Sequence, residues 1–299
     1  MKWPERGPPG RYAYVNGRYL PHGQAAVHIE DRGLQLGDAI YEVFRAEAGQ
    51  LLDETGHLDR LERSLAALEL PMPVTRAALR LILRELLRRN RIRDGIIYLQ
   101  VTRGAFRRDH PMPDMPAKPS LILTARAGDP AVAAARLAGG VKVITLPDER
   151  WARRDIKTTQ LLPAVLAKTA AKRAGAAEAW LVDADGFVTE GGSTNGWIVD
   201  AAGTLITRPL SREILPGVTR GVVLAAAREA GLAVVERKFT VAEALQAKEA
   251  FLTSASGAAV PVVAIDGKAV ANGHPGLLTL RLQALYAGKS GSGQNGIKG

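Results

Sequence analysis

Lys157 is the first residue whose surroundings are suited to chemistry. It lies in the stretch DERWARRDIKTTQLLPAVLAK, residues 148–168, where an apolar strand gives way to a helix. A lysine in an apolar setting gives up its proton more easily than one in water, and the neutral amine is a nucleophile or a base. The same stretch allows a second interpretation, in which Lys157 is a surface lysine paired with Asp155.

Glu190 is the second candidate. It ends a short apolar strand in FVTEGGSTN, residues 187–195. The two glycines that follow allow a ligand to approach the backbone closely, and Ser193, Thr194 and Asn195 can hydrogen-bond that ligand. The pattern predicts an acidic binding position, with a plain loop as the alternative.

The stretch LPGVTRG, residues 215–221, has the features of a phosphate site, because Gly217, Val218 and Thr219 open a predicted helix. Unpaired backbone amides and the positive end of the helix dipole attract anions. No Gly-Lys-Ser/Thr follows, so this is not a Walker loop. Arg60, on another predicted helix, can add a charge-assisted contact unless it simply faces solvent.

A basic loop follows a predicted strand in RGAFRRDH, residues 103–110. It carries Arg103, Arg107, Arg108 and His110 within eight residues. Arginine combined with histidine is suited to binding a carboxylate. A merely basic loop is the alternative.

The composition excludes several classes of protein. The chain has 299 residues and no cysteine, which excludes disulfides, thiolate metal sites and a cysteine nucleophile. No run approaches the ~18 apolar residues of a membrane span, and the first residues lack the apolar core of a signal peptide. We therefore expect a cytoplasmic protein that does not bind a membrane.

The net charge of +10 makes nucleic acid an alternative partner. However, Arg76, Arg80, Arg84 and Arg88 recur every four residues opposite a leucine-rich face, which is typical of a solvated helix. The other basic residues are scattered, and no nucleic-acid-binding motif is present. A basic nucleic-acid-binding protein is therefore only a distant alternative.

Strands and helices alternate without a regular βαβ repeat, which predicts an α+β fold. YAYVNGRYL predicts a hairpin around Asn16 and Gly17, and TVAE at 240–243 predicts a capping box. Periodicity and end signals predict helices over 55–69, 75–89, 159–174 and 217–230.

The small-residue-rich segment AGDPAVAAARLAGG, residues 127–140, is weakly patterned and predicts the link between two domains. The expected organisation is a smaller N-terminal domain, a linker, a larger C-terminal domain and a disordered tail, over 1–127, 128–138, 139–287 and 288–299.

These stretches occur in an order and spacing that resemble the fold-type IV pyridoxal-phosphate aminotransferases, most closely the D-amino acid aminotransferases. The resemblance runs from about residue 12 to 285. The matching blocks are EDRGLQLGDAIYEVF, HLDRLERS, IYLQVTRGAFRRDHP, RWARRDIKTTQLLPAVLAK, VTEGGSTN, ILPGVTR and FLTSAS. Several blocks in fixed order are far more specific than any one of them.

The resemblance implies a two-domain fold with the site between the domains and pyridoxal 5'-phosphate as the cofactor. Lys157 is then the Schiff-base lysine and the acid/base, and Glu190 faces the pyridine nitrogen. The residues that hold the phosphate are then Arg60, Val218, Thr219 and Ser254. The residues that bind the substrate carboxylate are then Tyr41, Arg108 and His110.

The resemblance also implies a homodimer, because in that family the arginine and the histidine reach in from the neighbouring subunit. The expected substrates are D-alanine-type amino acids and a 2-oxo acid, 2-oxoglutarate or pyruvate, and no metal is expected. Branched-chain L-aminotransferases, aminodeoxychorismate lyase and (R)-amine transaminases share the lysine, the glutamate and the phosphate site, so they remain alternatives. The pair Arg108 and His110 favours the D-amino acid enzyme.

Three positions depart from the family pattern. Asp109 precedes the histidine where relatives have a small residue, and its charge could weaken the carboxylate site. Ala255 occupies a position where relatives often carry a hydroxyl, which leaves Ser254 or Ser256 to replace it. Gly192 stands where some relatives have serine, so we expect a larger or looser pocket there.

Overall fold

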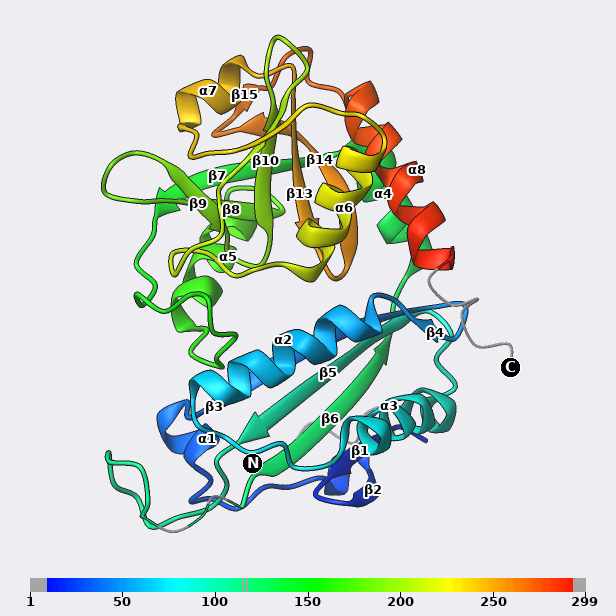
Figure 1. Ribbon diagram of the computed structural model, residues 1–299, viewed down its shortest axis with the longest axis vertical. Coiled ribbons are helices and arrows are strands. Elements are labelled where there is room, and N and C mark those ends of the chain that lie inside the picture. The colour runs from blue at the N-terminus through cyan, green and yellow to red at the C-terminus, as the bar shows by residue number, and fades with distance from the viewer. Residues whose placement is uncertain (1–9, 115, 117, 293–299) are drawn as a thin grey trace. The chain divides into compact units, whose positions relative to one another are not determined.

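The computed structural model of the protein describes residues 10–114, 116 and 118–292. The chain forms two compact units (Figure 1). The first comprises the residues up to Asp129 together with the short segment Ile156–Gln160, and the second comprises Pro130–Asp155 and the residues from Leu161 onward. Each unit combines one β-sheet with helices, which confirms the α+β prediction.

The first unit is built on an antiparallel sheet of six strands in the order β2-β1-β6-β5-β3-β4. The strands are β1 (Tyr12–Val15), β2 (Arg18–Pro21), β3 (Ala39–Glu47), β4 (Gln50–Leu51), β5 (Gly95–Thr102) and β6 (Ser120–Ala127). Along its whole length β5 pairs with β3 on one side and β6 on the other. The predicted hairpin joins β1 and β2, and Asn16 and Gly17 both take the positive φ angles that its tight turn needs.

Leucine-rich helices pack on this sheet. The helical segments of the first unit are η1 (His22–Gln24), α1 (Arg32–Leu36), α2 (Glu54–Ala67) and α3 (Arg76–Asn90). Leu61 and Leu65 of α2 and Leu79 and Leu83 of α3 are buried in one core with Phe44 of β3. The two longer helices therefore form where the leucine spacing predicts them, and their core holds β3 in place.

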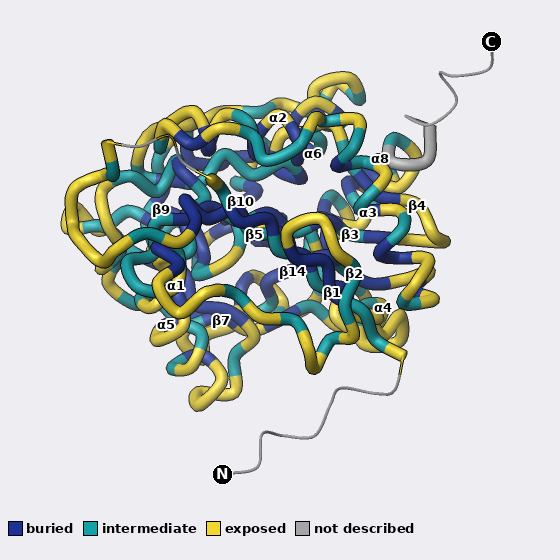
Figure 2. The backbone as a smooth tube through the Cα atoms, turned by 90° about the horizontal axis from the view of Figure 1, so that it is seen from below, coloured by how far each residue is buried: buried dark blue, intermediate teal, exposed yellow. Residues whose placement is uncertain are grey.

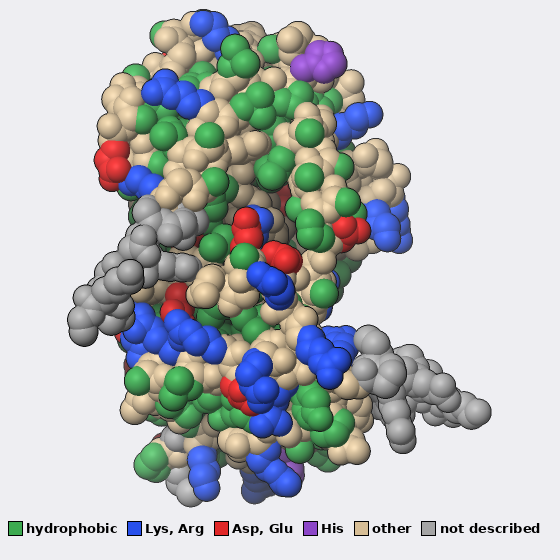
Figure 3. All heavy atoms as spheres, turned by 90° about the vertical axis from the view of Figure 1, so that its right-hand side faces the viewer, with side chains coloured by type: hydrophobic (Ala, Val, Ile, Leu, Met, Phe, Trp, Pro, Cys, Tyr) green, Lys and Arg blue, Asp and Glu red, His purple; other side chains and the backbone are tan. Residues whose placement is uncertain are grey.

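The basic face of α3 is paired with acidic residues of α2. Arg76 forms ion pairs with Asp59 and Glu62, and Arg84 forms one with Glu54. Figure 3 shows Lys and Arg side chains gathered on the surface of this unit. The arginines therefore form a solvated and largely neutralised helix face, as their spacing predicts.

The second unit is built on a mixed sheet of nine strands. Its order is β12-β11-β10-β13-β14-β7-β8-β9, and β15 pairs with β14. The strands are β7 (Val141–Pro147), β8 (Glu178–Val182), β9 (Val188–Gly191), β10 (Asn195–Val199), β11 (Leu205–Thr207), β12 (Val234–Glu236), β13 (Glu249–Ser254), β14 (Gly257–Ile265) and β15 (Lys268–Ala269). Figure 2 shows β10 in the colour of buried residues along its course.

The helices of the second unit are α4 (Pro130–Gly139), α5 (Leu162–Arg173), α6 (Val218–Glu229), α7 (Val241–Gln246) and α8 (Leu277–Ser292). The capping box predicted before α7 is present, because the Thr240 side chain accepts from the Glu243 N–H while the Glu243 side chain accepts from the Thr240 N–H. Gly175 and Gly231 follow α5 and α6 with positive φ angles, as left-handed residues after a helix do.

The structure corrects the predicted linker and tail. Residues 130–138 of the expected linker, 128–138, lie in α4 (Pro130–Gly139), which contacts β14 in the second unit. Proline at the first position of a helix and the alanines that follow it both favour a helix over an irregular link. Residues 288–292 of the expected tail continue α8. The remainder, 293–299, lies outside the described residues.

The predicted C-terminal domain, 139–287, is also interrupted, because the structure assigns Ile156–Gln160 to the first unit. The Tyr41 N–H donates to the Lys157 carbonyl at 2.9 Å, and the Thr159 N–H donates to the Ala39 carbonyl at 3.1 Å. The segment that carries Lys157 therefore pairs with β3 of the first unit.

Candidate active site

Lys157 lies beside the edge of β3 and is half-buried. Its Nζ is 4.1 Å from the centre of the Tyr41 ring, which is a cation–π distance. The expected alternative partner, Asp155, pairs instead with Arg153 at 3.0 Å. Within the described part of the chain, no carboxylate lies at ion-pair distance from Lys157. The amine is therefore held against an aromatic face without a carboxylate partner, which leaves it available to a ligand.

Tyr41 is part of a pair of aromatic rings. It stacks on Tyr98 of β5 with 5.6 Å between the ring centres. The Tyr98 hydroxyl donates to Gln100 Oε1 at 2.8 Å, and burial raises the pKa of Tyr98 to about 12. Tyr98 therefore stays protonated at neutral pH, and its ring fixes the orientation of Tyr41 beside Lys157.

Arg60 is buried on α2 and is held by Glu42 of β3. Arg60 Nε donates to Glu42 Oε1 at 2.7 Å and Arg60 Nη2 donates to Oε2 at 2.8 Å, while His57 Nδ1 lies 2.9 Å from Oε2. Burial opposes the charge of Glu42, but the Arg60 guanidinium outweighs it and lowers the carboxyl pKa to about 2. Arg60 is thus a cation in a fixed position, and the alternative of a solvent-facing arginine is wrong.

The pair of Glu42 and Arg60 makes a contribution to stability that depends on pH. Because the pKa of Glu42 falls from 4.5 to about 2 on folding, the carboxylate stabilises the fold fully above pH 4.5 and loses this effect as the pH falls toward 2. The full contribution is about 3 kcal/mol. We expect urea titrations to show the largest stability difference between wild type and Glu42→Gln near neutral pH, shrinking below pH 4.5. A difference that does not change with pH would contradict the assignment.

Arg108 and His110 lie on the exposed loop between β5 and β6 in the same unit as Tyr41. Among the described residues, neither side chain forms a hydrogen bond or an ion pair. Asp109 Oδ1 accepts from the backbone N–H of His110 at 2.8 Å. The Asp109 side chain, whose charge was expected to weaken the carboxylate site, thus binds a backbone N–H of its own loop.

Glu190 is buried on β9 of the second unit and accepts several hydrogen bonds. Arg150 Nη1 donates to Glu190 Oε1, Asn195 Nδ2 donates to Oε2 at 2.9 Å, and the Leu215 N–H donates to both oxygens at 3.1 Å. Burial raises the pKa of Glu190, although the Arg150 guanidinium acts in the opposite direction. Glu190 is therefore a fixed acid inside the unit and does not lie in a plain surface loop.

Sequence reasoning missed Arg150 as a site residue. Arg150 also donates to Asp148 at 2.8 Å, and Asp148 Oδ2 accepts from the Thr189 hydroxyl at 2.6 Å. The sequence did contain a feature that could have identified Arg150, because Asp148 and Arg150 directly follow the apolar strand that leads to Lys157. Charges at such a strand end are typical of a site.

Val218 and Thr219 are the first two residues of α6, and Thr219 is buried. Gly217 precedes them and provides no side-chain cap, so the first amides of the helix have no intrahelical partner. A Cβ atom on Gly217 would lie 2.0 Å from Asn195 Oδ1, so only glycine fits there. The helix start therefore presents backbone amides and a hydroxyl, as the phosphate prediction requires.

The other two positions that depart from the family pattern, Ala255 and Gly192, lie in the second unit. Ser254 ends β13, and its Oγ lies 3.2 Å from Ser256 Oγ, so the two hydroxyls flank Ala255. A Cβ atom on Gly192 would lie 3.2 Å from Glu178 Oε1, which already occupies the adjacent space. A side chain at position 192 would therefore be crowded by Glu178, and the expectation of a larger or looser pocket stays a prediction.

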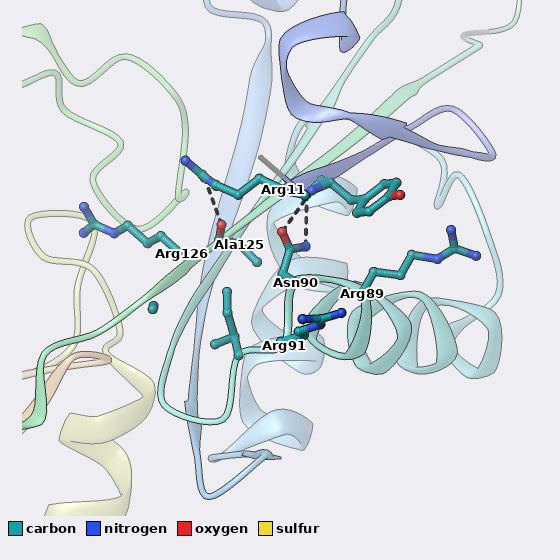
Figure 4. Close-up of a pocket in the computed structure, with 10 residues that line it drawn as sticks. Arg11, Arg89, Asn90, Arg91, Ala125 and Arg126 are labelled. Atoms are coloured by element: carbon teal, nitrogen blue, oxygen red, sulfur yellow. Dashed lines mark hydrogen bonds between the residues drawn. The ribbon is translucent and has the colours of Figure 1, made fainter. Parts of the chain in front are cut away.

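A hollow of about 580 Å³ lies on the first unit and contains none of these residues (Figure 4). Arg11, Arg89, Arg91 and Arg126 contribute to its lining. Arg11 donates to the Ala125 carbonyl at 2.9 Å. In Figure 4 the side chains of Arg91 and Arg126 extend to opposite sides, so the guanidinium groups do not converge on one ligand.

The donor set fits pyridoxal phosphate. Lys157 and Arg60 in the first unit supply an amine and a fixed cation, and Glu190 and Thr219 in the second supply a buried acid and a helix start. These are the groups that an aldehyde, a phosphate and a pyridine nitrogen need. Across residues 10–114, 116 and 118–292, no group of three His, Asp or Glu side chains is placed to hold a metal ion. No helix in that part of the chain is long and apolar enough to cross a membrane.

Residues 39–265 match the family described as Amino-transferase class IV, and the chain belongs to this family. It is 40% identical over 268 residues to the D-alanine aminotransferase of Bacillus licheniformis, an alignment that covers 90% of this chain and 93% of that one. The prediction of a fold-type IV pyridoxal-phosphate aminotransferase is thereby confirmed.

Solved structures agree with the fold. The Escherichia coli branched-chain amino acid aminotransferase superimposes with a TM-score of 0.86 at 24% identity, covering 93% of this chain and 94% of that one. A hypothetical aminotransferase from Mycobacterium tuberculosis, determined in its PLP-bound form, gives a TM-score of 0.82 at 23% identity, covering 95% of this chain and 100% of that one. The structural likeness is high, whereas the sequence likeness is greater toward the D-alanine enzyme.

Proposed function

We propose that the protein transfers amino groups from D-alanine-type amino acids to a 2-oxo acid, with 2-oxoglutarate or pyruvate as the acceptor. The observation that carries this proposal is the 40% identity to a D-alanine aminotransferase over 90% of the chain. The loop with Arg108 and His110 supports it, because a guanidinium and an imidazole can both donate hydrogen bonds to an α-carboxylate. The cytoplasmic location expected from the sequence is part of the proposal.

Bound pyridoxal phosphate supplies an aldehyde for amine exchange and a protonated ring that accepts the electron pair from the substrate Cα. In our proposal, Lys157 Nζ holds the aldehyde at rest. Lys157 Nζ would also act on the substrate, first as the base that removes the Cα hydrogen and later as the acid that returns a proton. Lys157 is suited to both tasks because it is half-buried and has no carboxylate partner in the described residues.

Glu190 is proposed to face the pyridine nitrogen, where its carboxylate would accept a hydrogen bond from the ring N–H and keep the ring protonated. Arg150 and Asn195 hold its carboxylate in position, so it needs no reorganisation when the ring charge changes. Arg60, the amides of Val218 and Thr219 and the hydroxyls of Thr219 and Ser254 are proposed to hold the phosphate.

Tyr41, Arg108 and His110 are proposed to fix the substrate carboxylate. Fixing the carboxylate on one side decides which enantiomer directs its Cα hydrogen at Lys157. The proposal is tested by comparing kcat/KM for D-alanine, L-leucine and (R)-1-phenylethylamine with 2-oxoglutarate and pyruvate as acceptors. We expect D-alanine to be preferred. A preference for L-leucine would support the branched-chain alternative, and a preference for the amine would support the (R)-amine transaminase alternative.

The proposal includes a homodimer in which Arg108 and His110 act in the neighbouring subunit's site. Mixing Lys157→Ala chains, which are expected to be inactive, with Arg108→Ala chains under exchange conditions tests this arrangement, provided that D-alanine is kept well below the raised KM of Arg108→Ala, where that variant turns over slowly. One site of each mixed dimer then has both residues, so we expect up to about one quarter of wild-type activity. If both residues act within one chain, mixing restores nothing, and the shared-site proposal is wrong.

A further inference from the structure

The block EDRGLQLGDAIYEVF contains charged residues for which the proposed chemistry has no role, and Arg32 is its one basic residue. Its side chain is 5% exposed and makes contacts outside its own helix. Arg32 Nε donates to Asp38 Oδ2 at 2.8 Å, Nη1 donates to the Asp109 carbonyl at 2.7 Å, and Nη2 donates to the His110 carbonyl at 3.2 Å. One guanidinium therefore links the start of β3 to the loop that carries Arg108.

Asp38 joins Arg32 to a second buried arginine. Arg103 Nε donates to Asp38 Oδ2 at 2.7 Å, and Arg103 Nη2 donates to the Leu68 carbonyl at the end of α2 at 2.7 Å. Burial works against the charge of Asp38, but hydrogen bonds from the two arginines outweigh it and lower the carboxyl pKa. Asp38 therefore remains ionised at neutral pH, and the two guanidinium groups stay in fixed positions.

The base of the loop is fixed by backbone contacts. The Arg32 N–H donates to the Gly104 carbonyl at 2.9 Å, and Asp31 forms a β-bridge with Ala105. Gly104 has a φ of +93°, and a Cβ atom there would lie 2.2 Å from the Lys118 carbonyl oxygen. The two ends of the loop thus approach as closely as glycine permits, while its tip is exposed.

The two carbonyls that Arg32 binds belong to the peptide groups before and after the Cα atom of His110. Fixing both peptide planes fixes the backbone angles of His110, and these determine the direction of its Cα–Cβ bond. The first of these carbonyls belongs to Asp109, which is the residue directly after Arg108. Arg32 thus holds the backbone from which the His110 side chain extends and which directly follows Arg108.

We propose that Arg32, anchored through Asp38 and Arg103, is a positioning residue that orients Arg108 and His110 for the substrate carboxylate. This inference rests on the proposed function of those two residues. A loop held in its binding geometry loses less conformational entropy when the substrate binds. Arg32 therefore affects carboxylate affinity without touching the substrate.

The first test compares Arg32→Lys with the control Arg11→Lys, which replaces another arginine of this unit that donates to a backbone carbonyl. A lysine ammonium cannot reproduce the planar fork that reaches three acceptors. We expect Arg32→Lys to raise the KM for D-alanine about tenfold while the visible cofactor band is unchanged. Arg11→Lys is expected to leave KM unchanged. An unchanged KM in Arg32→Lys would overturn the inference.

The second test asks whether Arg32 acts through the loop. In an Arg108→Ala/His110→Ala background, adding Arg32→Lys is expected to raise KM no further, because the residues that it positions are absent. The same tenfold rise in that background would show a merely structural role and overturn the inference. If the wild-type protein does not use D-alanine, the proposed function fails. The same variants are then compared with the α-amino acid that the protein does use.

The third measurement needs no cofactor. Trypsin cleaves after Arg107 and Arg108, and a loosened loop is cleaved faster. We expect the apoprotein of Arg32→Lys to be cut there several-fold faster than wild type and Arg11→Lys. Equal rates would contradict the inference. If Arg32→Lys does not fold, Asp38→Asn, which removes the charged partner of both arginines, replaces it in all three tests.

Discussion

Lys157→Ala is expected to lower the rate of transamination by about 10⁴-fold, because it removes both the group that holds the cofactor and the base for the substrate Cα hydrogen. The fold should persist, since the segment around Lys157 pairs with β3 through backbone groups of Tyr41 and Ala39. Steady-state assays with D-alanine and 2-oxoglutarate measure the loss.

The matched control is Lys172→Ala, which removes an exposed lysine on α5. Its kinetics should equal those of wild type. Borohydride reduction followed by peptide mapping gives an independent readout, because it fixes the cofactor to the lysine that holds it. Cofactor fixed to a residue other than Lys157, or a Lys157→Ala variant with normal activity, would refute the assignment.

Arg108→Ala is the second large effect. We expect the KM for D-alanine to rise about 100-fold, which is the effect of losing charge-assisted hydrogen bonds to a carboxylate. Cofactor binding should not change, because in the described residues no hydrogen bond joins Arg108 to Lys157 or Arg60. Titration with D-alanine, followed by assays at saturating acceptor, separates KM from kcat.

Arg107→Ala is the control for Arg108→Ala, because it removes a neighbouring exposed arginine from the same loop. We expect this control to retain the wild-type KM. If both variants raise KM equally, the loop attracts the substrate only through its general charge. If neither does, Arg108 does not bind the carboxylate.

The sequence was sufficient to predict elements that depend on local patterns. The leucine spacing of α2 and α3, the Asn16–Gly17 hairpin and the capping box at Thr240 all appear where they were predicted. The alanine-rich segment 130–139 was misjudged, because a helix without a buried face shows little periodicity and only its composition indicates it.

Long-range contacts could not be predicted from local patterns. The segment with Lys157 belongs to the first unit because Thr158 forms a bridge with Ile40, more than a hundred residues earlier. A weaker signal was available for Glu42. Glu42 lies on the same buried face of β3 as Ile40 and Phe44, two residues from each. The period of two in the sequence therefore already predicted a carboxylate in the core, where it needs a cationic partner.

The family blocks identified the candidate side chains but not their supports. The sequence pointed to Arg60, Glu190 and Arg108, whereas the partners that hold them, such as Glu42 and Arg150, became apparent only from hydrogen bonds between distant segments. Such partners determine where a catalytic group points, and no local pattern encodes that geometry.

The most direct test is the visible absorption spectrum of the purified protein, recorded before and after D-alanine and, in parallel, L-alanine. We expect a yellow protein whose band D-alanine converts to that of pyridoxamine phosphate while L-alanine leaves it unchanged. That result would establish the cofactor, the half-reaction and the enantiomer together. A band that L-alanine bleaches and D-alanine does not would contradict the D-amino acid proposal and the roles given to Arg108 and His110.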